Sequence, residues 1–195
     1  HLDHYGGAFS LLKEMPVKQV WGINAVYDSE QYMALLTQLV HSKIDFVSVK
    51  PGLTFPLTQN GSLNVLGPLS HDFENINNAS IVLQVSHGAM SYLLTGDIET
   101  QAENQLITHY AQLLSSDFLK IPHHGSKTSS QLSFLLQVQP KVAVISVGKN
   151  NRFHHPSQKV MERLERLKIK TYRTDQNGSV CVCSQANQFT MRSHI

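Results

Sequence analysis

Residues 119–126 read Leu119-Lys120-Ile121-Pro122-His123-His124-Gly125-Ser126. The leading apolar residues predict a short buried strand, which ends at the proline because proline cannot continue a central strand. Two adjacent histidines at a strand end can place one ring on a metal ion and the other on a substrate. Ser126 and Lys127 then supply hydroxyl and ammonium donors that suit phosphate. This stretch predicts a strand whose carboxyl end carries chemistry.

Two neighbouring segments repeat this pattern. An apolar strand over residues 91–95 runs into Gly96-Asp97, and a buried strand over residues 142–147 runs into Gly148-Lys149. In α/β proteins, ligand sites gather at the carboxyl edge of the strands, where Asp97 would project. The alternative interpretation makes Asp97 the N-cap of the helix that follows.

The loop after residue 147 carries further polar groups. Lys149 and Arg152 are placed to hold phosphate oxygens, and His155 precedes a proline as a candidate metal ligand or proton donor. An ordinary surface loop is the alternative, but the third repeat of strand, glycine and polar cluster argues against it.

Between these strands the apolar residues recur with helical spacing. Helices are predicted over residues 7–14, 29–41, 100–114, 131–138 and 157–167. Strands are predicted over residues 18–22, 45–50, 62–66, 79–85, 170–173, 179–184 and 188–191. The order indicates one α/β or α+β domain in which helices cover sheet faces. Cys181 and Cys183 would point the same way on their strand, which favours core packing over a disulfide.

Composition narrows the function classes. The chain has 195 residues, of which 41% are apolar and 15% charged, with a net charge of +2. These values fit a packed domain and exclude a disordered chain. No apolar run approaches the roughly 18–20 residues of a spanning helix. Residues 118–161 hold no Asp or Glu but six basic residues and four of the 11 histidines, which suggests an anionic ligand, a metal, or a solvated basic face.

The chain opens with His1-Leu2-Asp3-His4-Tyr5-Gly6-Gly7. Three candidate ligands lie within four residues, and on a loop leaving a strand end they can fan around an ion. Imidazole and carboxylate together suit Zn²⁺ or Mn²⁺. The alternative is a terminal loop with chance histidines. With Asp97 as a shared carboxylate, the set fits a two-metal hydrolase, whose ions lie roughly 3.5–4 Å apart.

Together these motifs resemble the metallo-β-lactamase superfamily, whose signature is His-x-His/Asp-x-Asp-His-x-Gly-Gly. More specifically they are similar to the C-terminal hydrolase domain of the ComEC/Rec2 DNA-uptake channel family. Besides the stretches above, the similarity includes Asn78-Ala79-Ser80-Ile81-Val82, Ile98-Glu99 and Tyr172-Arg173-Thr174-Asp175, and so spans most of the chain. The family's first histidine would lie two residues before His1. We therefore expect residues 1–195 to form a single domain that lacks its N-terminal strands.

The resemblance implies an αββα sandwich with two mixed sheets inside and helices outside. It implies two divalent ions, Mn²⁺ or Zn²⁺, at one edge of the sheets. Their ligands would be His1, Asp3, His4, Asp97 and one of the two adjacent histidines, with His123 favoured. Asp3, His124 and His155 would serve catalysis. Ser126, Lys127, Lys149 and Arg152 would bind phosphate, with Lys120 among the groups that neutralise charge. Neither His71 nor His87 is a convincing match for the superfamily's third-motif histidine.

The function implied is metal-dependent hydrolysis of DNA phosphodiesters, which would degrade the non-imported strand during natural transformation. The basic groups predict sequence-nonspecific binding of single-stranded DNA, and the few aromatic residues among them predict no extended stacking platform. One alternative is a small-molecule phosphodiesterase similar to a choline-phosphate esterase. Another is a non-catalytic module that guides DNA in the channel.

The resemblance also sets expectations for location and partners. The domain would be soluble and monomeric in isolation. It would lie outside the cytoplasm as part of an integral membrane protein, and its partners would be DNA and the rest of the channel polypeptide.

Overall fold

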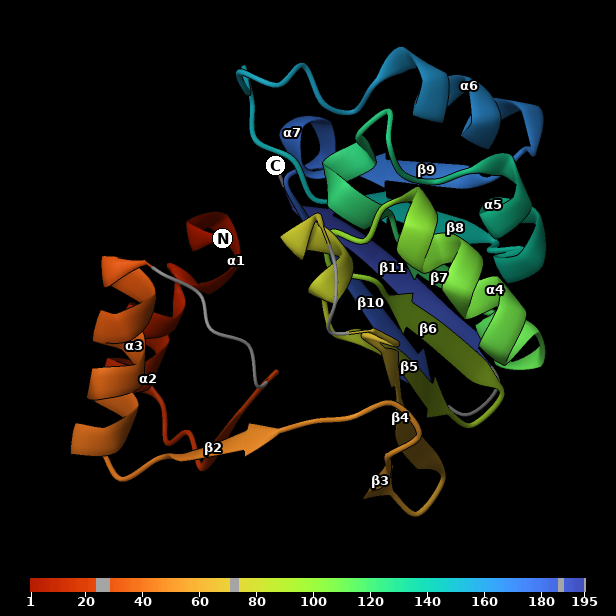
Figure 1. Ribbon diagram of the computed structural model, residues 1–195. Helices are drawn as coiled ribbons and strands as arrows, with labels where there is room; N and C mark the ends of the chain where they lie inside the picture. Colours follow the sequence, from red (N-terminus) through yellow and green to blue (C-terminus); the bar gives the residue numbers. More distant parts are fainter. Residues whose placement is uncertain (24–28, 71–73, 186–187, 195) are drawn as a thin grey trace. The chain divides into compact units, whose positions relative to one another are not determined.

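A computed structural model describes residues 1–23, 29–70, 74–185 and 188–194. The chain forms two compact units, His1–Val49 and Lys50–Ile195. Figure 1 shows the elements of each unit. The expectation of a single domain stays a prediction.

The first unit contains three helices and a small parallel sheet. Its elements are α1 (Leu2–Tyr5), α2 (Ala8–Glu14), β1 (Gln19–Gly22), α3 (Glu30–His41) and β2 (Asp45–Ser48). Strands β1 and β2 pair in parallel, as two strands joined through a helix do. Helix α3 begins as predicted, because the Ser29 side chain accepts a hydrogen bond from the backbone N–H of Tyr32.

The second unit is built on one seven-stranded mixed sheet in the order β3-β4-β5-β6-β7-β8-β9. Its strands are β3 (Thr54–Thr58), β4 (Gly61–Gly67), β5 (Val82–His87), β6 (Met90–Leu94), β7 (Phe118–Lys120), β8 (Val142–Ile145) and β9 (Lys170–Arg173). The first four are antiparallel, and the last four run parallel. The predicted hairpin between β5 and β6 is confirmed.

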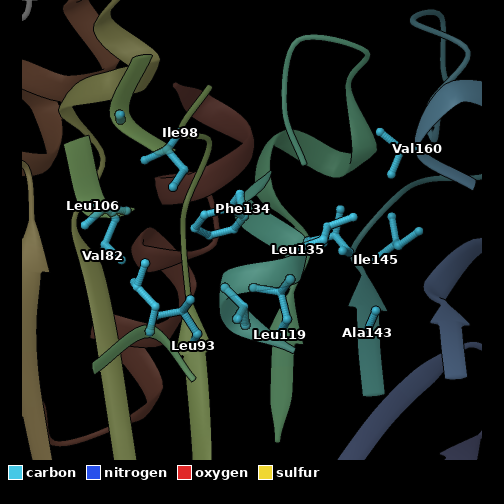
Figure 2. Close-up of a cluster of buried hydrophobic side chains, with 14 of the residues drawn as sticks. Val82, Leu93, Ile98, Leu106, Leu119, Phe134, Leu135, Ala143, Ile145 and Val160 are labelled. Atoms are coloured by element: carbon cyan, nitrogen blue, oxygen red, sulfur yellow. The ribbon is translucent and has the colours of Figure 1, made fainter. Parts of the chain in front are cut away.

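Three helices connect the parallel strands, namely α4 (Thr100–Leu114), α5 (Leu132–Val138) and α6 (Gln158–Arg166). Alternate residues of the strands form the main core with these helices. Figure 2 shows this packing, with Leu93, Leu119 and Ala143 on the strands and Phe134 and Val160 on the helices. Parallel strands in consecutive order bring their carboxyl ends to one sheet edge, and this edge holds the chemical motifs.

A hairpin of β10 (Ser179–Gln185) and β11 (Gln188–His194) forms a two-stranded antiparallel sheet. Val182 and Met191 pack with Phe118 and Val142, which point away from the three helices. Because Val182 takes the inward position, the alternating residues Cys181 and Cys183 are exposed free thiols. The prediction that these cysteines pack in the core is therefore wrong, while the absence of a disulfide between them is confirmed.

Several short elements were not expected. The N-terminal motif forms the one-turn helix α1 instead of the predicted loop. The edge strand β3, the 3₁₀ turn η1 (Ile76–Ala79) and the one-turn helix α7 (Thr174–Asn177) were not predicted either. A further 3₁₀ turn, η2 (Pro122–Gly125), holds the paired histidines. In the part of the chain that is described, every helix is too short or too polar to cross a membrane.

Candidate metal centre

Asp97 lies where the chain leaves β6, and its side chain is nearly inaccessible to solvent. Gly96 has a φ of +56°, and a Cβ there would lie 2.6 Å from the Cβ of Ser80. The Asp97 backbone N–H donates to the Ser80 hydroxyl at 3.0 Å, and the Glu99 N–H donates to Asn78 at 2.8 Å. The chain just before β5 therefore holds Asp97 in place. Helix α4 has Glu99 as its N-cap, so the alternative of Asp97 as the N-cap is wrong.

The paired histidines sit on an unusual backbone. His123, His124 and Gly125 have φ values of +47°, +53° and +81° in succession. Non-glycine residues rarely adopt positive φ, and strained backbone of this kind concentrates at functional sites. The His123 N–H donates to the carbonyl of Gly96 at 3.2 Å, which ties this turn to the Asp97 turn. The strained backbone directs the two rings to different partners.

His124 faces Asp97. Its Nδ1 lies 2.7 Å from the backbone carbonyl of Ser146, at the end of β8, and its Nε2 lies 3.5 Å from Oδ2 of Asp97. A carbonyl only accepts hydrogen bonds, so Nδ1 carries the proton and Nε2 is the atom suited to ligate a metal. The hydrogen bond with Asp97 raises the pKa of His124, with burial opposing it.

His123 pairs with a different carboxylate. Its Nδ1 lies 3.0 Å from Oε1 of Glu99, and that oxygen accepts a hydrogen bond from the Asn77 side chain at 3.1 Å. Burial raises the pKa of Glu99, but hydrogen bonds from Asn77, Asn75 and Thr128 outweigh it and lower the pKa overall. The geometry thus favours His124 over His123 as the metal ligand, whereas the sequence favoured His123.

His155 completes the cluster of rings. Its ring centroid lies 5.8 Å from that of His123, and its Nδ1 is buried without a hydrogen-bond partner among the described residues. Burial lowers the pKa of His155, and the nearby rings of His123 and His124 add to this. A buried polar atom without a partner is uncommon and points to a group that binds there.

The loop that carries His155 is fixed at both ends. Asn151 accepts from the His155 N–H and donates to the His155 carbonyl, each at 2.8 Å. At the start of the loop, the Thr174 hydroxyl bonds both the N–H and the carbonyl of Val147. At its end, Pro156 packs where a Cβ of Gly125 would lie, and the Ser157 N–H donates to the Gly125 carbonyl at 2.8 Å. Asn151, Thr174 and Glu99 had no assigned role from the sequence.

The predicted phosphate ligands divide into two groups. Lys127, Lys149 and Arg152 are exposed, as basic groups that meet a ligand must be. Ser126 is buried, and its hydroxyl pairs with that of Thr128 at 2.9 Å, which favours a structural part in the turn. Lys120 donates to the carbonyls of Gly96 and Ile121, so it braces the turns around Asp97.

The N-terminal motif belongs to the first unit. His1, Asp3 and His4 are exposed on or beside α1, and Nε2 of His4 lies 3.7 Å from Oδ2 of Asp3. The Tyr5 hydroxyl pairs with Ser29 at 3.2 Å, which fastens α1 to the start of α3. This contact holds the helix that carries the Asp3 carboxylate and the neighbouring imidazole groups.

His87 and His71 are not part of the candidate centre. His87 is the last residue of β5 and pairs with Met90, where β6 begins, at the end of the strand away from Asp97. Its Nδ1 lies 2.9 Å from the Ser184 hydroxyl. It therefore does not join the cluster at the carboxyl edge. His71 lies outside the described residues.

Residues 1–149 match the family model described as "Metallo-beta-lactamase superfamily". The chain belongs to the metallo-β-lactamase superfamily. The fold predicted from the sequence is confirmed by this match. Asp97 and His124 lie in the matched part of the chain, whereas His155 lies beyond it.

Superfamily relatives include two bacterial proteins. The chain is 38% identical over 178 residues to "ComE operon protein 3" of Bacillus subtilis (strain 168), covering 91% of this chain and 23% of that protein. It is 41% identical over 104 residues to "Competence protein ComA" of Neisseria gonorrhoeae, covering 53% of this chain and 15% of that protein. The resemblance to the ComEC/Rec2 family is confirmed. The chain spans about a quarter or less of these relatives.

A solved structure shares the fold at low sequence identity. CmlA, a diiron β-hydroxylase from Streptomyces venezuelae, superposes with a TM-score of 0.55 and 11% identity, covering 89% of this chain and 42% of that chain. This likeness concerns the fold alone. A shared fold does not fix the reaction, so the reaction of this chain has to be argued from its own residues.

The residues of the second unit fit a metal ion. Asp97 offers a carboxylate, and His124 offers an Nε2 whose orientation is fixed through Nδ1, the usual arrangement of a metal-ligating histidine. His155 adds a buried ring nitrogen nearby. Imidazole and carboxylate donors without thiolates suit Zn²⁺, Mn²⁺ or iron. Family and donor set together support a metal-dependent hydrolase.

Proposed function

We propose that this chain is a metal-dependent phosphodiesterase that cleaves single-stranded DNA without sequence preference. The observation that carries the proposal is the Asp97–His124 pair, fixed through Ser146, with exposed basic residues on the loop that follows Ser146. The pair suits a metal, and the basic loop suits the phosphates of the substrate. The relative from Neisseria gonorrhoeae is a competence protein, which supports DNA as the polymer.

Two divalent ions, Mn²⁺ or Zn²⁺, are the proposed cofactors. Asp97 and His124 would hold them together with His1, Asp3 and His4 of the N-terminal motif. When bound, the ions supply an ionised water as nucleophile and neutralise charge on the phosphoryl group. His123 remains a further candidate ligand, although its Nδ1 faces Glu99.

The chain's own groups have separable parts in this reaction. Lys149 and Arg152 attract and orient the DNA backbone. Their pairing with phosphates releases counterions from the DNA, so binding should weaken as the salt concentration rises. The ring of His155, on the loop held by Asn151, lies 5.8 Å from that of His123. His155 would hydrogen-bond a phosphoryl or leaving oxygen. Lys120 donates to the carbonyls of Gly96 and Ile121 and so links the turn before Asp97 to the turn before His123.

The biological role follows as part of the same proposal. The chain would act within a longer membrane protein, outside the cytoplasm, and degrade the strand that is not imported during natural transformation. The relatives are several times longer than this chain, so the rest of the protein would supply the channel. The hydrolase unit itself would work as a monomer.

The test is cleavage of a fluorescent single-stranded oligonucleotide with Mn²⁺ or Zn²⁺ present. We expect cleavage that EDTA abolishes and that Asp97→Ala lowers by at least about 10²-fold, as loss of electrostatic stabilisation at a reacting centre does. Asp45→Asn, on an exposed strand position, is the matched control and should cleave normally. Metal-loaded, folded protein that leaves DNA intact would refute the nuclease proposal.

The same assay separates the two alternatives. A protein that spares DNA but hydrolyses p-nitrophenylphosphorylcholine would be a small-molecule phosphodiesterase. A protein that retains DNA without cleaving it, and does so equally well as Asp97→Ala, would be a guiding module.

A further inference from the structure

The loop between β8 and α6 exposes an aromatic ring beside the candidate centre. Phe153 is 63% exposed, although single exposed apolar residues need no explanation by themselves. The side chains around Phe153 are what make its exposure notable. The ring lies nearly parallel to that of His155, with an interplanar angle of 20° and a centroid separation of 5.8 Å. The Arg152 guanidinium lies over the Phe153 ring at 4.8 Å from the centroid.

Hydrogen bonds of Asn151 fix the backbone of the loop that carries Phe153. Asn151 bridges the N–H and carbonyl of His155, and its side chain also donates to the Gly148 carbonyl at 3.2 Å. The His154 N–H returns to the Asn151 carbonyl at 3.2 Å. These bonds close a tight turn whose outermost residues are Arg152, Phe153 and His154. The ring is therefore presented on a braced turn, so little order is lost when a ligand stacks on it.

We propose that Phe153 is the stacking position for one nucleobase of single-stranded DNA, next to the phosphate that is cleaved. The inference rests on the proposed function and deepens it, because it names the group that selects an unpaired strand. The Arg152 guanidinium already lies over this ring, and a nucleobase is a flat π system that would take the same face. Arg152 then pairs with a phosphate, which its charge favours.

Stacking explains a preference for single strands without sequence readout. Every base has a π face, so stacking on an aromatic side chain tolerates any sequence. In a duplex, both faces of an internal base are covered by neighbouring bases, so Phe153 gains nothing there. One ring beside the cluster would serve a single nucleotide, which agrees with the prediction of no extended stacking platform.

The test compares oligonucleotides with and without bases. Binding of fluorescein-labelled dT12 and of a 12-unit tetrahydrofuran abasic analogue is measured by anisotropy in EDTA, which suppresses cleavage. We expect Phe153→Leu to weaken dT12 binding by about 5- to 100-fold, the range for loss of one base–aromatic stack, and Phe153→Trp to keep it. Binding of the abasic analogue should change far less. Leu136→Ala, an exposed position on α5, is the matched control.

Equal losses on dT12 and on the abasic analogue would overturn the stacking proposal, as would no loss at all. Wild-type protein that binds both oligomers alike would also overturn it. The nuclease proposal is read separately from Mn²⁺-dependent cleavage and its Asp97→Ala control. Cleavage without base-dependent binding refutes stacking alone, and base-dependent binding without cleavage refutes the nuclease alone.

Discussion

The Nδ1 atom of His124 lies 2.7 Å from the carbonyl oxygen of Ser146, so the strand β8 dictates which nitrogen of this histidine is available to a metal. His123, its neighbour in sequence, is turned toward Glu99 instead. The two rings look equivalent in the sequence but are not equivalent in the structure. This difference gives the first prediction.

His124→Asn should weaken Zn²⁺ or Mn²⁺ binding more than His123→Asn does. Loss of a direct ligand should cost at least the roughly 10- to 100-fold in metal affinity that outer-shell changes cost. Isothermal titration calorimetry of the two metal-stripped variants measures the difference. If His123→Asn lost more metal affinity than His124→Asn, His123 would be the metal ligand, as the sequence favoured.

Asn151→Ala should impair DNA cleavage while leaving the fold intact. The variant removes the three side-chain hydrogen bonds that close the turn carrying Phe153 and His155. Misplacement of a positioning group by about 1 Å costs on the order of 10²-fold in rate, so we expect a 10- to 100-fold fall in kcat/KM. Asn104→Ala, on an exposed position of α4, is the control. Equal activity of both variants would contradict a positioning part for Asn151.

Gly125→Ala should destabilise the protein and reduce activity. Gly125 has a φ of +81°, and a Cβ there would lie 2.6 Å from the Cβ of Pro156. Strain of both kinds costs about 1–3 kcal/mol or more in the free energy of unfolding. Gly148→Ala has nothing within 4 Å of the added Cβ and should be nearly neutral. Urea unfolding compares the two, and a neutral Gly125→Ala would show that the Pro156 turn can move aside.

The free energy of unfolding should depend on pH because of the buried side chain of Glu103. It is fully buried on α4, and its carboxylate accepts from the backbone N–H groups of Ser130 and Gln131. Burial raises the pKa of Glu103 to about 7, with these bonds and Arg163 opposing the rise. Between about pH 4.5 and 7 the native state then holds a proton that the unfolded state has lost. Stability should therefore fall as pH rises through this window.

Glu103→Gln removes that titration. We expect wild type to lose about 1–3 kcal/mol of unfolding free energy relative to Glu103→Gln between pH 5 and pH 7.5. Urea unfolding at both pH values gives the difference. A constant difference would mean that the two N–H donors keep Glu103 ionised throughout.

The sequence predicted the helices and the parallel strands well because their apolar periodicity is strong. Helix α4 begins and ends at the predicted residues, and the position of Asp97 at the end of β6 follows from that pattern. Strand β3 was missed because Pro56 lies within it, which only an edge strand that pairs on one side tolerates. The cysteines were misplaced because pattern alone does not say which face of a hairpin meets the sheet.

The orientation of the two histidines lay beyond sequence reasoning for a different reason. It depends on successive positive φ values at His123 and His124, and no residue type other than glycine signals such a backbone. Glu99 and Asn151 were missed because their parts are contacts to residues far along the chain or across a loop. The resemblance supplied candidate ligands, but only the local backbone says where each ring points.

The clamp of Thr174 on Val147 has a consequence for biosynthesis. Strands β6 to β9 stand in the sheet in the order in which they leave the ribosome. A nascent chain can thus form the Asp97 and His124 turns early, while the loop with Phe153 and His155 stays without its anchor until Thr174 emerges. The loop with Phe153 and His155 would therefore be the last part of the candidate site to take its final shape on a growing chain.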